Sequence, residues 1–431
     1  MLVPLSVRIF SNLKDLLMSD EFKNKYRKSP KDFIRSRVLG FAELIALQLK
    51  SLVLSLSVEL SNFLDILDEE KNYTKQAFSQ ARHKLKHQAF IALNEQFIAD
   101  YYSYPQLKLY ANKYLFLAVD GSMCQLPEEE AVGNYFGRWK NQYGSGMPMA
   151  RISVLYDLLN EVSILHTIEP NHVSEKETFI AFRRAFDTKF FAKDYQCLYV
   201  MDRGYPSFTI CKDLSLAGHS FVIRSKSSFC NEVKAFVKED IAEKNICIPA
   251  KGRLVNGLEE DLELRIVRVL LNSEEYEYLL TNTDFSIQEL NEIYRLRWGI
   301  ETFYSFLKER MQIDNFSSRT VEGVLQDFYA NLLTANMSLL LIKEAQEELD
   351  KEQKQKKNKH QYKINKNVAL GILLKKIPLI LLKPEIMQIE LEKIRPKLKK
   401  NKIAVIPERS FVRRKMRRNR RKYHMNQKRA F

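Results

Sequence analysis

The stretch Lys113–Asp120, KYLFLAVD, is a short apolar run that ends in an acidic residue and predicts a buried strand. A second run of the same kind, Tyr195–Asp202, reads YQCLYVMD and also ends in aspartate. Between them, ARISVLYDL (150–158) and EVSILHTIEP (161–170) predict a hairpin, and SEKETFIAFRRAFDTKF (174–190) predicts a helix. Two acidic side chains are therefore expected at the ends of two buried strands.

The remaining elements extend this pattern toward the C-terminus. HSFVIRSK (219–226) predicts a further strand, and LELRIVRVLL and EYEYLLTNT make an insertion at about 225–285 rich in β sequence. A long helix is predicted from about Ser286 to Gln312, with Asp-Phe-Ser as its N-cap region. The order strand, strand, strand, helix, strand, then helix predicts an α/β protein with a ribonuclease H-like core.

Three carboxylates are the predicted catalytic and metal-binding residues: Asp120, Asp202 and Glu301 on the long helix. Such a cluster is costly without metal, because like charges at close range raise one another's pKa. Oxygen-only ligands suit Mg²⁺, with Mn²⁺ as a substitute. Two ions about 3.5–4 Å apart would activate the attacking oxygen and stabilise the leaving one. Taken singly, each aspartate is more simply explained as a turn residue.

The long helix carries four polar residues at i, i+3, i+7 and i+14: Tyr294, Arg297, Glu301 and Lys308. At about 100° per residue they project within roughly 60° of one another. The neighbouring arc is apolar and is expected to pack on the sheet. Tyr294, Arg297 and Lys308 are therefore predicted to contact DNA phosphates beside Glu301. An ordinary amphipathic helix could produce the same arrangement by chance.

The segment Tyr294–Lys308, YRLRWGIETFYSFLK, resembles the Y-x2-R-x3-E-x6-K signature of insertion-sequence-four family DDE transposases. AVDGS around Asp120 resembles the first-acid motif of that family, and VMDRGYPSF around Asp202 resembles the second. SQARHKL (79–85) is similar to its N-terminal helical region, so the resemblance covers roughly residues 30–340. It implies a ribonuclease H-like catalytic domain with a β-rich insertion before the glutamate.

The resemblance also implies cut-and-paste transposition, in which the 3′-hydroxyl of the element attacks the opposite strand and forms a hairpin. The implied partners are double-stranded DNA with terminal inverted repeats, target DNA, and a second copy in a dimeric synaptic complex. Better-known relatives stack a flipped base on a tryptophan of the β insertion. Here the only tryptophans are Trp139 and Trp298, which leaves Phe229 or Tyr276 as substitutes.

Residues 1–104 are predicted to form a helical DNA-binding domain. Within it, YTKQAFSQARHKLKHQAFIALNEQF (73–97) is predicted as a helix whose exposed polar side chains include Arg82 and Lys84 as DNA contacts. The alternative is a solvated charged face. His83 and His87 are spaced i, i+4 but lack an accompanying acid or third ligand, which argues against a zinc site.

The other predicted ranges are a catalytic domain at 105–345, a C-terminal helical region at 346–408 and a basic tail at 409–431. The formal net charge is +16, and the tail holds eleven Arg and Lys residues without an acid. It is expected to add DNA affinity through phosphates without reading sequence. Binding to RNA, or a role in solubility alone, remains an alternative for the tail.

No apolar run approaches the roughly 18–20 residues that span a bilayer. The N-terminal sequence also lacks the features of a secretory signal. The five cysteines are odd in number and lack C-x-x-C spacing, which is typical of reduced core thiols. We expect a soluble bacterial protein of the cytoplasm, associated with the nucleoid and not with a membrane.

Three rival functions are open at this stage. The chain could be a transposase-derived DNA-binding protein without catalysis, although the three acids argue against it. It could be a metal-dependent nuclease of the same fold that cuts without joining. A basic RNA- or ribosome-associated protein is supported only by the tail, and it leaves the acidic residues unexplained.

Overall fold

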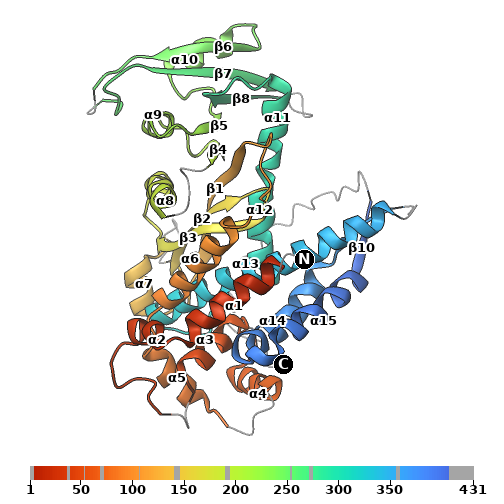
Figure 1. Cartoon of the computed structure of the whole chain (residues 1–431). Helices are drawn as coiled ribbons and strands as arrows, with labels where there is room; N and C mark the ends of the chain where they lie inside the picture. The colour runs from red at the N-terminus through yellow and green to blue at the C-terminus, as the bar shows by residue number, and fades with distance from the viewer. Residues whose placement is uncertain are drawn as a thin grey trace. The chain divides into compact units, whose positions relative to one another are not determined.

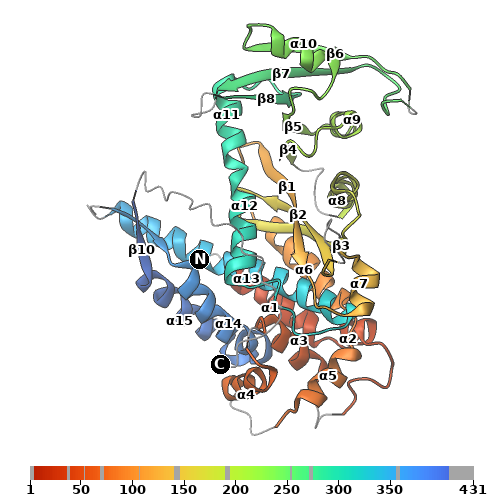
Figure 2. The same cartoon turned by 180° about the vertical axis from the view of Figure 1, so that it is seen from behind.

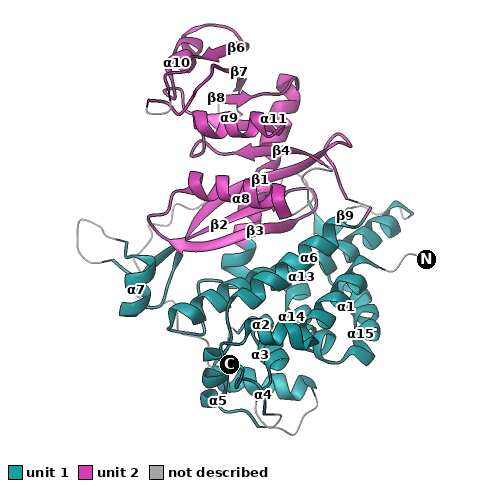
Figure 3. Ribbon diagram, turned by 60° about the vertical axis from the view of Figure 1, so that its left-hand side comes forward, with its two compact units in different colours: residues 1–104, 124–150, 306–431 teal, residues 105–123, 151–305 magenta. Residues whose placement is uncertain are grey.

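A computed structural model describes residues 4–35, 39–52, 54–67, 72–105, 107–139, 146–189, 195–252, 255–270, 275–355 and 360–406. The basic tail predicted at 409–431 lies outside the described residues. The chain divides into two compact units (Figure 3). Unit 1 combines residues 1–104, 124–150 and 306–431, and unit 2 combines residues 105–123 and 151–305. The helical ranges expected at the two ends of the chain therefore belong to the same unit.

An eight-stranded sheet with the order β3-β2-β1-β4-β5-β8-β7-β6 is the framework of unit 2 (Figure 1). Its strands are β1 (Tyr114–Gln125), β2 (Met149–Asp157), β3 (Val162–Pro170), β4 (Gln196–Met201), β5 (Ser220–Ser225), β6 (Glu243–Ile248), β7 (Leu262–Leu270) and β8 (Tyr276–Thr281). The first five follow the chain order expected for a ribonuclease H-like core. The strands of the predicted insertion lengthen the same sheet instead of forming a separate one.

The central strands are parallel and buried, which explains why their sequences are continuous apolar runs. β1 pairs with β4, and β4 pairs with β5, both in parallel register. The predicted hairpin at 150–170 is confirmed as β2 and β3. One boundary was wrong, because β1 does not end at Asp120 but continues to Gln125.

Helices cover both faces of this sheet (Figures 1 and 2). On one face lie α8 (Glu175–Lys189) and α9 (Phe208–Leu216), and on the other lie α11 (Ile287–Leu296) and α12 (Trp298–Ser305). Leu290 and Ile293 of α11 pack into the core cluster with Phe116, Val200 and Val222 of the central strands. These three strand residues therefore mark the face that α11 covers.

The insertion also contains a helix that the sequence pattern did not indicate, α10 (Asn231–Lys238). Only two of its side chains, Val233 and Phe236, are buried. The segment is only eight residues long, and a stretch of this length is too short for periodicity to separate a helix from a strand.

The long helix predicted from about Ser286 to Gln312 is present in three pieces. Ser286 caps α11 through a capping box with Glu289, as its sequence predicted. Arg297 separates α11 from α12, and residues Phe306–Arg310 form a π-helical turn, η1, that belongs to unit 1. Leu296 belongs to the apolar arc of the helix that was expected to pack on the sheet, but its side chain is 45% exposed.

Unit 1 is mainly helical and is built around α13 (Val321–Lys354), which is 34 residues long and buried over most of its length. The helices of its N-terminal part are α1 (Leu5–Met18), α2 (Asp20–Tyr26), α3 (Phe41–Leu49), α4 (Leu56–Leu67), α5 (Lys75–His83), α6 (Gln88–Tyr102) and α7 (Glu130–Phe136). Beyond α13 lie α14 (Lys366–Leu382), η2 (Pro384–Ile386) and α15 (Met387–Lys400). Within the described ranges, no helix is long and apolar enough to cross a membrane.

One expectation for unit 1 was wrong in detail, because the helix predicted over residues 73–97 is divided into α5 and α6. The polar, lysine-rich composition of segment 351–366 indicates a flexible link or an exposed helix end. The segment contains the exposed end of α13 and also strand β9 (Gln361–Ile364). β9 pairs antiparallel with β10 (Lys402–Val405) in a two-stranded sheet. This pairing is non-local, and local sequence patterns do not record it.

Candidate active site

Asp120 and Asp202 are brought together by the parallel register of β1 and β4. The register pairs residues as far as Ala118 and Val200, and two further residues along each segment lead to Asp120 and Asp202. Neighbouring strands are about 4.8 Å apart, and residues two apart point to the same face. Asp120 and Asp202 therefore share the face of Val200, which is the face covered by α11.

Asp120 is strongly affected by its surroundings. Burial raises the pKa of its carboxyl to about 6, and the nearby negative charges of Glu175 and Asp202 act in the same direction. The Gly121 N–H, which donates to Asp120 Oδ1 at 2.9 Å, and the positive charge of Arg297 act against this rise. A raised carboxyl pKa at a half-buried acidic site is typical of functional positions.

Asp202 has two partners on the same face of the sheet. The hydroxyl of Tyr294 donates to Asp202 Oδ1 at 3.2 Å, and the guanidinium of Arg224 lies 3.9 Å from that oxygen. Arg224 is also paired at 2.7 Å with Glu277, a buried residue of β8. Neither Arg224 nor Glu277 was singled out from the sequence, although both lie within predicted strands.

Glu301 of α12 is held by Arg297. Arg297 Nη2 lies 2.6 Å from Glu301 Oε1, and the arginine side chain is buried at 9% exposure. The guanidinium also stands 5.5 Å from the ring centroid of Tyr294. Tyr294, Arg297 and Glu301 thus form one contacting group, which connects to the aspartates through the hydrogen bond of Tyr294 to Asp202.

Lys308, the fourth residue of the predicted polar face, lies in the π-helical turn of unit 1. Burial raises the pKa of Cys124 and of Asp314 in this region, and the positive charge of Lys308 acts against both shifts. Cys124 Sγ donates to Asp314 Oδ1 at 2.9 Å. The wider π turn changes the angular phase of the helix. The straight-helix argument that aligned Lys308 with Glu301 therefore does not hold for this segment.

The donor chemistry of the site fits a hard divalent cation, but the three acids are not gathered into a ready-made cluster. Within the described residues, no three His, Cys, Asp or Glu side chains are close enough together to hold a metal ion. Asp120 and Asp202 nevertheless offer only oxygen donors, which suit such an ion. The third carboxylate, Glu301, is turned to Arg297.

The aromatic residues considered for base stacking differ in their availability. Phe229 packs against Phe208 with ring centroids 5.0 Å apart, so one of its faces is already used. Tyr276 is 52% exposed at the start of β8, although the guanidinium of Arg268 lies 5.1 Å from its ring. Trp298, directly after Arg297, is 53% exposed, and Trp139 of unit 1 is 52% exposed.

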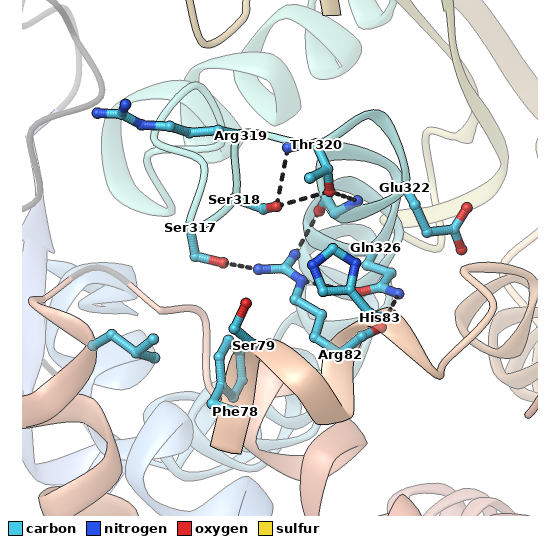
Figure 4. A pocket seen from close by; sticks show the side chains of 12 residues that line it. Phe78, Ser79, Arg82, His83, Ser317, Ser318, Arg319, Thr320, Glu322 and Gln326 are labelled. Carbon is cyan, nitrogen blue, oxygen red and sulfur yellow. Dashed lines mark hydrogen bonds between the residues drawn. The ribbon is translucent and has the colours of Figure 1, made fainter. Parts of the chain in front are cut away.

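Arg82 does not lie on an exposed face, as its sequence context had suggested. It is 6% exposed, pairs with Asp327 at 2.7 Å and donates to Gln326 at 2.8 Å. Figure 4 shows its guanidinium pointing toward Ser317 at one side of a pocket. Arg82 therefore braces α5 against the start of α13, and its donors are engaged within the protein.

The other residues considered in the N-terminal region are Lys84, His83 and His87. Lys84 is exposed directly after α5, and its contact with DNA stays a prediction. His83 ends α5, whereas His87 lies before α6 and has Glu322 Oε2 3.1 Å from its Nδ1. This acid comes from α13, far away in the sequence, so its presence beside His87 could not be foreseen. The helix break between the two histidines also removes their i, i+4 relation.

Comparison with known proteins adds an independent line of evidence. The family model of the transposase DDE domain matches residues 111–337, which is more than half of the 431 residues. The chain is 28% identical over 148 residues to "Transposase InsG for insertion sequence element IS4" of Escherichia coli strain K12. That alignment covers 32% of this chain and 34% of the relative, so the chain matches about a third of the relative's length.

Among solved structures, the chain is similar to a cryo-EM structure of the piggyBac transposase synaptic complex with hairpin DNA. The two share 11% sequence identity with a TM-score of 0.49. The superposition covers 93% of this chain and 87% of the other.

Proposed function

We propose, because this chain belongs to the family of transposase DDE domains, that it cleaves the ends of an insertion sequence and joins them to target DNA. The observation that supports the proposal is the register of β1 and β4, which pairs Ala118 with Val200, two residues before Asp120 and Asp202, on the face covered by α11. Tyr294, Arg297 and Glu301 come to that same face from α11 and α12. Paired acids beside an arginine and a phenol suit phosphodiester chemistry.

Asp120, Asp202 and Glu301 are the proposed catalytic residues and would hold Mg²⁺, as two ions, with Mn²⁺ as a substitute. Bound there, the ions would supply Lewis-acid activation of the attacking oxygen and charge stabilisation of the leaving one. Arg297 orients Glu301 through their 2.6 Å contact and brings positive charge to Asp120. Tyr294 orients Asp202 through its hydroxyl.

The DNA partners we propose are double-stranded DNA with terminal inverted repeats and the target DNA, bound by a dimer in the synaptic complex. Arg297 and Tyr294 would contact phosphates at the site, and Arg224 would add a cation beside Asp202. Lys308 and the exposed Lys84 would contact DNA from unit 1. The basic tail would add affinity that depends on salt and not on sequence.

Cut-and-paste transposition through a hairpin is the proposed course of the reaction. A flipped base stacks on an aromatic ring that is accessible from the solvent. Among the aromatic residues of unit 2 considered above, Tyr276 and Trp298 are exposed, whereas Phe229 is packed against Phe208. Tyr276 and Trp298 are therefore better placed than Phe229 to stack on that base.

The test is a reaction of the purified full-length protein with labelled inverted-repeat ends and a target plasmid in Mg²⁺. The proposal expects nicked ends, hairpins and joined products. Nicked ends without joined products would instead identify a metal-dependent nuclease. Specific binding without any cleavage, in both Mg²⁺ and Mn²⁺, would identify a catalytically silent DNA-binding protein.

A further inference from the structure

A fourth acidic side chain, Glu175, reaches the end of the sheet where the two aspartates lie. It is the first residue of α8, which covers the face opposite α11 (Figures 1 and 2). A Cβ atom added to Gly121 would lie 2.7 Å from Glu175 Oε1, and one added to Gly204 would lie 3.9 Å from Oε2. The carboxylate thus lies against the residue after Asp120 and near the second residue after Asp202.

This contact explains why a glycine, Gly121, stands at this position of the AVDGS motif. A Cβ atom at Gly121 would lie closer to Glu175 Oε1 than non-bonded atoms approach, so the carboxylate could not keep its present position. Gly121 adopts ordinary strand geometry within β1, so the residue is small for space and not for backbone conformation. The sequence next to the first acid is therefore adapted to admit a carboxylate from another element.

The surroundings of Glu175 include a cation that pairs with it and a buried hydroxyl that has no partner. Glu175 forms an ion pair with Arg151 of β2. The Tyr205 side chain is 1% exposed, and its hydroxyl has no hydrogen-bond partner among the described residues. Burial raises the pKa of that hydroxyl well above its ordinary value, and the negative charges of Glu175 and Asp120 act in the same direction. A buried phenol without a partner, near two acids, points to a group that the site takes up.

We propose that Glu175 is a further acidic residue of the ion-binding site, and that Arg151 neutralises it until a divalent cation enters. The inference rests on the proposed metal-dependent function and deepens it. The contact with Gly121 brings the carboxylate of Glu175 next to Asp120, and like charges at close range repel one another. A divalent cation shared by Glu175 and Asp120 would relieve this repulsion, in competition with the guanidinium of Arg151.

The experiment measures Mn²⁺ binding by electron paramagnetic resonance in the full-length protein without DNA, so that the readout does not depend on activity. Glu175→Gln should weaken Mn²⁺ binding by about tenfold or more. Arg151→Gln removes the competing cation and should tighten binding. Glu177→Gln, on the same helix but exposed, is the matched control and should bind as the wild type does. Glu175→Asp keeps a carboxylate and should retain part of the affinity.

The opposite signs of the two main variants separate an ion-binding role from a structural one. If Arg151 and Glu175 only brace α8 against β2, both variants should impair binding together and lower the unfolding temperature without metal. That result, or wild-type affinity in Glu175→Gln, would overturn the inference. Asp120→Asn tests the proposed function separately: it should lose both Mn²⁺ binding and nicking even where Glu175→Gln behaves as wild type. An Asp120→Asn variant that keeps both would instead count against the metal-dependent function.

Discussion

The two halves of the candidate site are held in different ways. Asp120 and Asp202 are placed by a parallel strand register between β1 and β4, in which backbone hydrogen bonds set the spacing. Glu301 is placed by a side chain, because its carboxylate is paired with the guanidinium of Arg297 at 2.6 Å. The helix that carries it is interrupted at Arg297 and becomes π-helical from Phe306.

This difference shows which part of the site can adjust. A register cannot slip by one residue without turning every side chain to the opposite face, so the aspartate pair is fixed. Glu301 can change partners by a rotation of its side chain. Movement of Glu301 away from Arg297 is therefore the simplest way to gather three carboxylates that the described residues do not already hold together.

Loss of any one acid should give the largest effect. Asp120→Asn, Asp202→Asn and Glu301→Gln should each reduce nicking in Mg²⁺ by roughly a thousandfold, because a ligand to the ion supplies several kcal/mol of charge stabilisation. Binding of the element's ends, measured by gel shift, should stay close to wild type. Glu292→Gln, an exposed acid of α11, is the matched control for Glu301. Near-wild-type nicking by one variant would remove that residue from the site.

Substitution of the cations should have a smaller and step-specific effect. Hairpin formation brings phosphates close together, and fixed cations must offset their repulsion. Arg297→Ala and Lys308→Ala should therefore slow hairpin formation on a pre-nicked substrate by roughly tenfold more than they slow nicking. Denaturing gels should show nicked DNA accumulating.

The matched control for these cation variants is Arg295→Ala, an exposed arginine of α11. Equal slowing of both steps by Arg297→Ala would identify a general phosphate anchor or an effect through Glu301. No slowing by Lys308→Ala would make that lysine part of a solvated face. A difference between the two variants would follow the division of the helix, since Arg297 contacts Glu301 and Lys308 lies in the π-helical turn.

The sequence predicted what depends on local periodicity. The apolar runs before Asp120 and Asp202 identified two strands, and Ser286 marked the start of α11. It did not predict contacts between distant segments. Arg82 is buried because it pairs with Asp327, which lies 245 residues away in the chain. A helical pattern in the sequence does not record a partner so distant. Arg224 and Glu277 near Asp202 were missed for the same reason.

The break at Arg297 had no signal either, since neither proline nor a pair of glycines accompanies it. Trp298 and Gly299 follow it, and a Cβ atom on Gly299 would lie 2.8 Å from Leu158 Cδ2. The structure thus shows close packing of Gly299 next to the break, and no residue there is an intrinsic helix breaker. This packing involves Leu158, which is distant in the sequence, so the local sequence pattern could not reveal it.

The smallest expected effect concerns stability, and it should differ in sign between the two halves of the site. The pKa of Asp120 is raised from 3.8 to about 6 by burial, so its contribution to stability is complete below pH 3.8 and is lost as pH rises through about 6. In EDTA at pH 7.5, Asp120→Asn should therefore raise the unfolding temperature, by about 2–4 °C. This gain should disappear as the pH is lowered toward 4.

Glu301→Gln should instead lower the unfolding temperature, because it leaves the buried guanidinium of Arg297 without its carboxylate. Calorimetry of both variants across this pH range decides the matter, and a pH-independent change of the same sign in both would show that Asp120 and Glu301 are held alike.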